Sequence, residues 1–149
     1  MSSQDLLRQI ADAFSQSAAP GEGDVLYAGA YSGDPELEEI KLFFGRREWQ
    51  SIMPWDVFRF RHALSFFSDS ALAYYAPAWI SCSLLDEDTV DTAIEDLVAT
   101  LGRKDASLWT DEQRRAICVW LAEIRSIPDA KILELALRKL GCNVNSCKS

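Results

Sequence analysis

His62 is the one histidine of the chain, so any catalytic arrangement that needs an imidazole base has to use it. An enzyme of this kind would place His62 beside carboxylates such as Asp56 or Asp69, and a metal- or carboxylate-dependent enzyme stays open as an alternative. The neighbours of His62 in a predicted helix are apolar, Phe58 and Leu64 among them. A histidine in that setting is more often packed or half-exposed than catalytic. We therefore expect no catalytic residue and a protein that is not an enzyme.

The four cysteines are Cys82, Cys118, Cys142 and Cys147. Cys142 and Cys147 have a C-x4-C spacing, but no second pair of ligands exists to complete a zinc site. Glycine spacing matches neither a phosphate loop nor a dinucleotide fingerprint. We expect no metal and no cofactor. Cys82 and Cys118 fall on apolar helix faces, Cys142 and Cys147 have the spacing to pair, and in a cytosolic chain we expect all four thiols to stay free.

The acidic run DEDTVDTAIED, from Asp86 to Asp96, is the most polar segment of the chain. It begins like a calcium loop, but Val90 occupies a ligand position and the bend glycine is missing. On a helix, Asp88, Asp91 and Glu95 share one face. That face could be merely solvated, hold a metal, or meet the lysines and arginines of a protein partner. The partner-binding candidates, which add two tyrosines of a glycine-rich connection, are Glu87, Asp88, Asp91, Glu95, Tyr27 and Tyr31.

The tryptophans fall mostly within apolar spacing, which predicts core positions. They are Trp49, Trp55, Trp79, Trp109 and Trp120. Tyr27 and Tyr31 lie outside such spacing and are expected to reach the surface, where tyrosine is a common binding anchor.

The chain carries a net charge of −8, which argues against nucleic acid or an anionic membrane as a partner. The same charge suits a basic protein partner. No basic lead-in followed by an apolar run marks a secretion signal, and no apolar run is long enough for a membrane span. We therefore expect a cytoplasmic protein.

Apolar residues recur at spacings of three and four, and no alternation of period two persists. The chain of 149 residues is predicted to form a single all-α domain, a bundle of about six or seven short helices, with 142–149 as a frayed tail. The densest apolar segment, 65–85, should form a central helix that Pro77 kinks or breaks near Tyr75. The other expected helices start or lie near 3–16, 34–44, 54–62, 89–101, 110–127 and 129–140.

Three segments carry a resemblance: His62-Ala-Leu-Ser-Phe-Phe-Ser68, Tyr74-Tyr-Ala-Pro-Ala-Trp79 and Leu108-Trp-Thr-x-Glu-Gln-Arg114. The chain resembles an uncharacterised family of small acidic bacterial proteins. The resemblance transfers no catalytic residue. It implies a partner-binding role, one form of which is an immunity protein that neutralises a basic toxin. We expect a non-enzymatic protein-binding module, with an enzyme using His62 and a structural homodimer as the alternatives.

Overall fold

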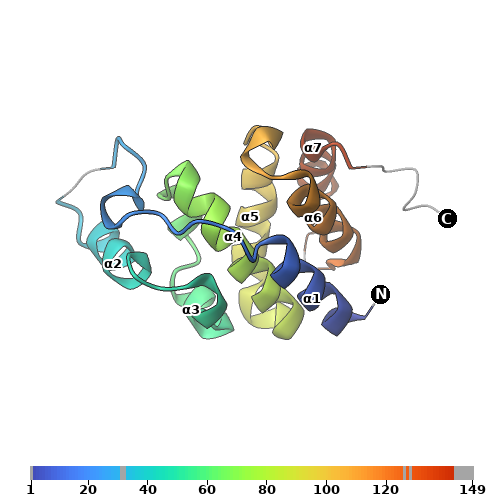
Figure 1. Ribbon diagram of the computed structural model, residues 1–149, viewed down its shortest axis with the longest axis horizontal. Helices are drawn as coiled ribbons and strands as arrows, with labels where there is room; N and C mark the ends of the chain where they lie inside the picture. Colours follow the sequence, from blue (N-terminus) through green and yellow to red (C-terminus); the bar gives the residue numbers. More distant parts are fainter. Residues whose placement is uncertain (1, 31–32, 126, 128, 143–149) are drawn as a thin grey trace.

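A computed structural model of the chain describes residues 2–30, 33–125, 127 and 129–142. Within these residues the chain forms seven α-helices in one all-α domain, as predicted (Figure 1). Their bounds are α1 Ser3–Ala13, α2 Pro35–Phe44, α3 Pro54–Arg59, α4 Asp69–Leu85, α5 Glu87–Leu101, α6 Asp111–Glu123 and α7 Ala130–Leu140. Figure 1 shows α2 and α3 at one end of the molecule, α6 and α7 at the other, and α4 and α5 between them.

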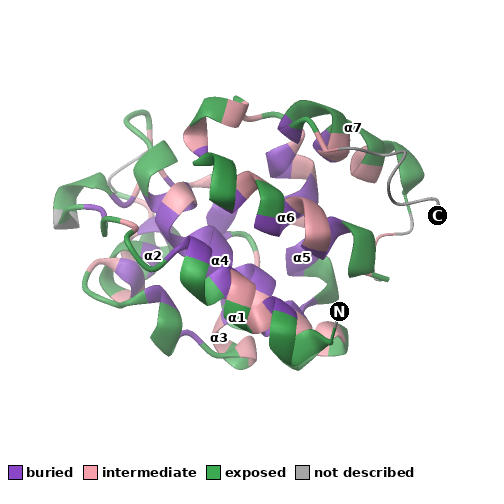
Figure 2. Cartoon of the chain, turned by 45° about the vertical axis from the view of Figure 1, so that its right-hand side comes forward, coloured by how far each residue is buried: buried purple, intermediate pink, exposed green. Residues whose placement is uncertain are grey.

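Helix α4 is the centre of the core. Its 17 residues include 11 buried ones, so most of its circumference is apolar and covered by the rest of the domain (Figure 2). Ser68 caps its start by accepting the amide of Ala71 at 3.0 Å. The helix continues through Pro77 as one element, so the predicted break does not occur, because surrounding packing holds the turn that lacks an amide. No helix among the described residues is long and apolar enough to cross a membrane.

Polar side chains inside the core tie α4 to its neighbours. The Tyr75 hydroxyl donates to the carbonyl oxygen of Arg47 at 2.8 Å and also to that of Phe44. On the other side of the domain, Trp120 of α6 donates its indole N–H to Ser83 Oγ at 2.8 Å. Each bond satisfies a buried polar group, which would otherwise carry a desolvation penalty. These bonds fix α2 and α6 on the central helix.

One side chain joins the start of α6 to the end of α1. Gln113 forms the predicted capping box with Thr110, whose amide it accepts at 3.0 Å. Its Nε2 also donates to Ala13 O and to Ser17 Oγ, both at 3.3 Å. The buried Gln113 side chain therefore binds the last residue of α1 and caps the start of α6.

The connection between α1 and α2 lies against the domain. A short extended piece at Val25–Tyr27 pairs with the chain just before α4, through an isolated bridge between Leu26 and Phe67. Tyr27 N donates to Phe66 O at 2.9 Å, and Ser68 N donates to Val25 O at 2.9 Å. This pairing positions the first residues of α4.

A disulfide joins Cys118 to Cys142, so the expectation of free thiols is wrong for this pair. Helix α7 packs beside α6, and the left-handed turn at Gly141 directs Cys142 back, which brings the two Cα atoms to 5.6 Å. Cys142 is therefore part of the fold and not of a frayed tail; residues 143–149, with Cys147, lie outside the described residues. Disulfides persist mainly in oxidising compartments, so the bond removes one reason for placing the protein in the cytoplasm.

Candidate protein-binding surface

Helix α5 carries the acidic run on its outer face. Asp86 is its N-cap, and Val90, Ile94 and Leu97 are buried among the residues that face the core. Asp88 and Asp91 are exposed on the opposite side. The helix that the sequence predicted from Thr89 thus begins two residues earlier, and the predicted separation of acidic and apolar faces is confirmed.

The carboxylates of this face differ in what they contact. Glu87 accepts the amide of Arg125 at 2.9 Å and so ties α5 to the segment after α6. Asp91 accepts the amide of the adjacent Thr92 at 2.6 Å. Asp88 and the half-buried Glu95 form no ion pair with any described residue. Glu87 and Asp88 lie in the first turn of α5, where negative charge stabilises a helix, whereas Asp91 and Glu95, four residues apart, repel by a few tenths of a kcal/mol.

Helix α3 places aromatic side chains in solvent. Trp55 is 66 % exposed and Phe58 is 38 % exposed, and their ring centroids lie 5.4 Å apart. The guanidinium carbon of Arg61 lies 4.9 Å from the centroid of the Phe58 ring. We call Trp55, Phe58 and Arg61 the α3 surface. It combines the residue types that are enriched at the energetic centres of protein interfaces.

The prediction that Trp55 is a core residue is wrong; Trp49, Trp79, Trp109 and Trp120 are buried as predicted. Helix α3 has only six residues, and within it Val57 alone is buried. Pro54 begins the helix, and Asp56 accepts the amide of Met53 at 2.9 Å, so the start of the helix is fixed by its own residues. Trp55 therefore falls on the outer side. A six-residue helix shows too little periodicity for the sequence to reveal this.

Helix α3, which carries the α3 surface, packs directly against α5. Just before α3, the Ile52 carbonyl oxygen accepts the Cys82 thiol, with Sγ and oxygen 3.5 Å apart, near the turn that leads into α5. Just after α3, His62 Nδ1 lies 3.7 Å from Asp96 Oδ2. These contacts hold the ends of α3 against α4 and the C-terminal half of α5.

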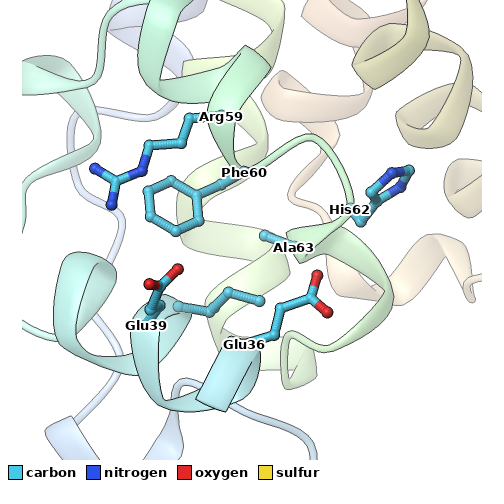
Figure 3. A pocket seen from close by; sticks show the side chains of 7 residues that line it. Glu36, Glu39, Arg59, Phe60, His62 and Ala63 are labelled. Carbon is cyan, nitrogen blue, oxygen red and sulfur yellow. The ribbon is translucent and has the colours of Figure 1, made fainter. Parts of the chain in front are cut away.

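His62 lies outside any α-helix, since α3 ends at Arg59. It borders a hollow of about 90 Å³ lined also by Glu36, Glu39 and Phe60. Figure 3 shows the imidazole turned away from the Phe60 ring and from the two glutamates. The carboxylate that lies close to His62 is that of Asp96, and the side chains of both residues are at least 40 % exposed.

The two carboxylates that the sequence suggested for an enzyme with a His62 base, Asp56 and Asp69, have other partners. Asp56 accepts the amide of Met53, and Asp69 pairs with Lys104 at 2.8 Å. The geometry does not bring either one to His62.

Tyr27, one of the predicted surface tyrosines, is 44 % exposed. It lies beside the segment that leads into the N-terminal end of α4, whereas Glu87 lies just beyond the C-terminal end of α4. A helix of this length spans about 25 Å, so the structure does not join Tyr27 to the start of the acidic face. Tyr31 lies outside the described residues.

The model of a family of unknown function (DUF6714) matches residues 2–141. The chain belongs to this family. The match spans all seven helices, so the DUF6714 domain is the fold described above. No curated protein and no solved structure matches the chain.

Proposed function

We propose that this chain is a non-enzymatic protein-binding module whose α3 surface anchors a protein partner. The observation that supports the proposal is the exposure of Trp55, which is 66 % accessible and lies against Phe58 beside Arg61. Burying an aromatic side chain at an interface stabilises the complex by about 2–3 kcal/mol. Because Trp55 is mostly exposed in this fold, a partner that buries it would gain that stabilisation. Tryptophan and arginine at the centre of an interface carry much of the binding free energy.

The acidic face of α5 complements this anchor. A net charge of −8, with Asp88 and Glu95 outside any ion pair among the described residues, favours encounter with a basic protein. Exposed charges act mainly on the association rate, and an apolar anchor acts mainly on the dissociation rate. An immunity protein that neutralises a basic toxin is the specific form of this function that we propose.

Affinity capture from the source cell tests the proposal. Wild-type protein and the Trp55→Ala variant are immobilised at equal density, and captured proteins are identified by mass spectrometry. A matched control is Leu42→Ala, which removes an apolar side chain that is 81 % exposed on α2. We expect a partner that wild type and Leu42→Ala retain and Trp55→Ala loses. Recovery of the same proteins by all three would contradict the proposal.

A further inference from the structure

We infer that the segment bound at the α3 surface carries an apolar side chain next to a carboxylate. This inference rests on the proposed function and specifies the chemistry of the partner at that surface. Trp55 and Phe58 provide the apolar contact, and Arg61 provides the charge. The charge of Arg61 is positive and so opposite in sign to the net charge of the chain.

The Arg61 guanidinium is held in place by contacts within the chain. Its Cζ lies 4.9 Å from the centroid of the Phe58 ring, and its Nη1 donates to the Phe58 carbonyl oxygen at 3.0 Å. A guanidinium has five N–H donors, so this bond leaves four of them for other acceptors. Because the side chain is already fixed, a bound ligand would lose less side-chain entropy by pairing with it.

Arg61 forms no ion pair with the described residues, although the chain has 23 acidic residues. Arg114 and Arg138, by contrast, pair with carboxylates of their own helices, Asp111 and Glu134. The acidic residue of α3 itself, Asp56, accepts the amide of Met53. No carboxylate of the described part of the chain therefore pairs with Arg61, and a partner's Asp or Glu can bind it through two parallel N–H···O bonds.

The arrangement of Trp55, Phe58 and Arg61 limits which side chains of a partner can bind there. The Trp55 and Phe58 rings, tilted by 31° to each other, offer an apolar area, which suits a leucine, methionine or aromatic side chain. Arg61 lies against the same Phe58 ring, so the carboxylate must come from a residue adjacent to that apolar side chain. A partner that is basic overall can meet this requirement with one acidic residue at the contact, since long-range attraction and local pairing are separate contributions.

Short synthetic peptides test the inference without knowledge of the partner. One carries a leucine flanked by glutamates, and a second carries the same leucine flanked by lysines. Binding is followed by NMR through the indole N–H signal of Trp55, which is assigned by its absence in Trp55→Phe. We expect the glutamate peptide to bind the wild type more tightly. Arg61→Gln should weaken that binding about tenfold or more, which is the loss expected for a charge-assisted hydrogen bond.

Two further variants make the result specific. Arg61→Lys keeps the charge but loses the planar pair of donors, and it should weaken binding as well. Arg115→Gln removes an exposed arginine of α6 and should leave binding unchanged. Thermal unfolding of each variant confirms that it is folded.

Several results would overturn the inference. These are equal or tighter binding of the lysine peptide, no binding of either peptide, or no effect of Arg61→Gln. A concentration-dependent dimer that Trp55→Ala abolishes would also overturn it, because the occupant would then be a second copy of the chain. If Trp55→Ala abolishes partner capture while Arg61→Gln does not, the proposed function stands and the inference fails. If Trp55→Ala leaves capture intact, the proposed function itself fails.

Discussion

Trp55 and Phe58, three residues apart on α3, lie ring against ring at the surface with their centroids 5.4 Å apart. Trp79 of α4, in contrast, is fully buried. Two tryptophans of one small domain therefore do different things: one fills the core, and the other faces solvent.

Stability measurements separate the two roles. Trp55→Ala should change the free energy of unfolding by less than about 1 kcal/mol, because most of the side chain is already in water. Trp79→Ala should cost about 3–5 kcal/mol, since it leaves a cavity in the core. Urea denaturation followed by circular dichroism measures both. A loss for Trp55→Ala as large as that for Trp79→Ala would show that Trp55 is a structural residue.

Charge reversal on α5 should act on association. Asp88→Lys combined with Asp91→Lys should slow binding of a basic partner and flatten the dependence of the rate on salt between about 0.05 and 0.5 M. Glu36→Lys with Glu39→Lys is the matched control, because it reverses two exposed carboxylates with the same spacing on α2. Stopped-flow kinetics measure the rates. Equal slowing by both double variants would assign the effect to net charge and not to the α5 face.

Reduction of the Cys118–Cys142 disulfide should lower the free energy of unfolding by about 3 kcal/mol, because the bond closes a loop with a sequence separation of 24 residues. The double variant Cys118→Ser with Cys142→Ser should show the same loss and no further response to reductant. Denaturation curves with and without reductant provide the measurement. Alkylation of Cys118 in the oxidised folded protein would show that the bond is not formed.

Gln113 should contribute measurably to the stability of the fold, although its side chain is polar. Gln113→Ala removes the capping bond to Thr110 and leaves the Ala13 carbonyl oxygen without its donor, so we expect a loss of about 1–3 kcal/mol. Gln16→Ala, at an exposed glutamine, should change stability by less than about 0.5 kcal/mol. Thermal and urea unfolding compare the two. Equal effects would mean that the link between α1 and α6 contributes nothing.

Stability should fall in alkaline solution. Burial raises the pKa of the Cys82 thiol to about 12, and burial is also the main cause that raises the pKa of Tyr75 well above its usual value. A raised folded pKa means that the folded state holds its proton when the unfolded chain loses it. The stabilising contribution is therefore complete below the unfolded pKa, which is about 9 for the thiol and about 10 for the phenol, and is lost above it.

The measurement is the free energy of unfolding as a function of pH from about 7 to 11. We expect a decline that begins near pH 8.5–9 in the wild type. In Cys82→Ala the decline should begin about one pH unit higher, at the titration of Tyr75. A wild-type curve that is flat to pH 10 would contradict the burial of both groups.

Local signals in the sequence predicted the helices well where caps and periodicity agreed. Asp34 with Pro35 begins α2, Thr110 with Gln113 begins α6, and Gly141 ends α7, each within one residue of a predicted helix bound. Helix α4 was harder, because it is buried on nearly every side and packing keeps it continuous through Pro77. The propensity of one residue could not show that.

Features that depend on tertiary contacts could not be predicted from local pattern. The Cys118–Cys142 bond requires that α7 return to α6, whereas the spacing along the chain suggested only the nearer pair of Cys142 and Cys147. The exposure of Trp55 depends on which side of a six-residue helix meets α4 and α5. The acidic face of α5 could be predicted, because this helix is long enough for its acidic and apolar residues to show the helical period.

The most direct test of the account is the dissociation constant of the captured partner for wild type, Trp55→Ala and Leu42→Ala. If the α3 surface is the anchor, Trp55→Ala raises the dissociation constant about 30-fold or more, mostly through faster dissociation, and Leu42→Ala leaves it unchanged. Equal dissociation constants for all three proteins would contradict the account.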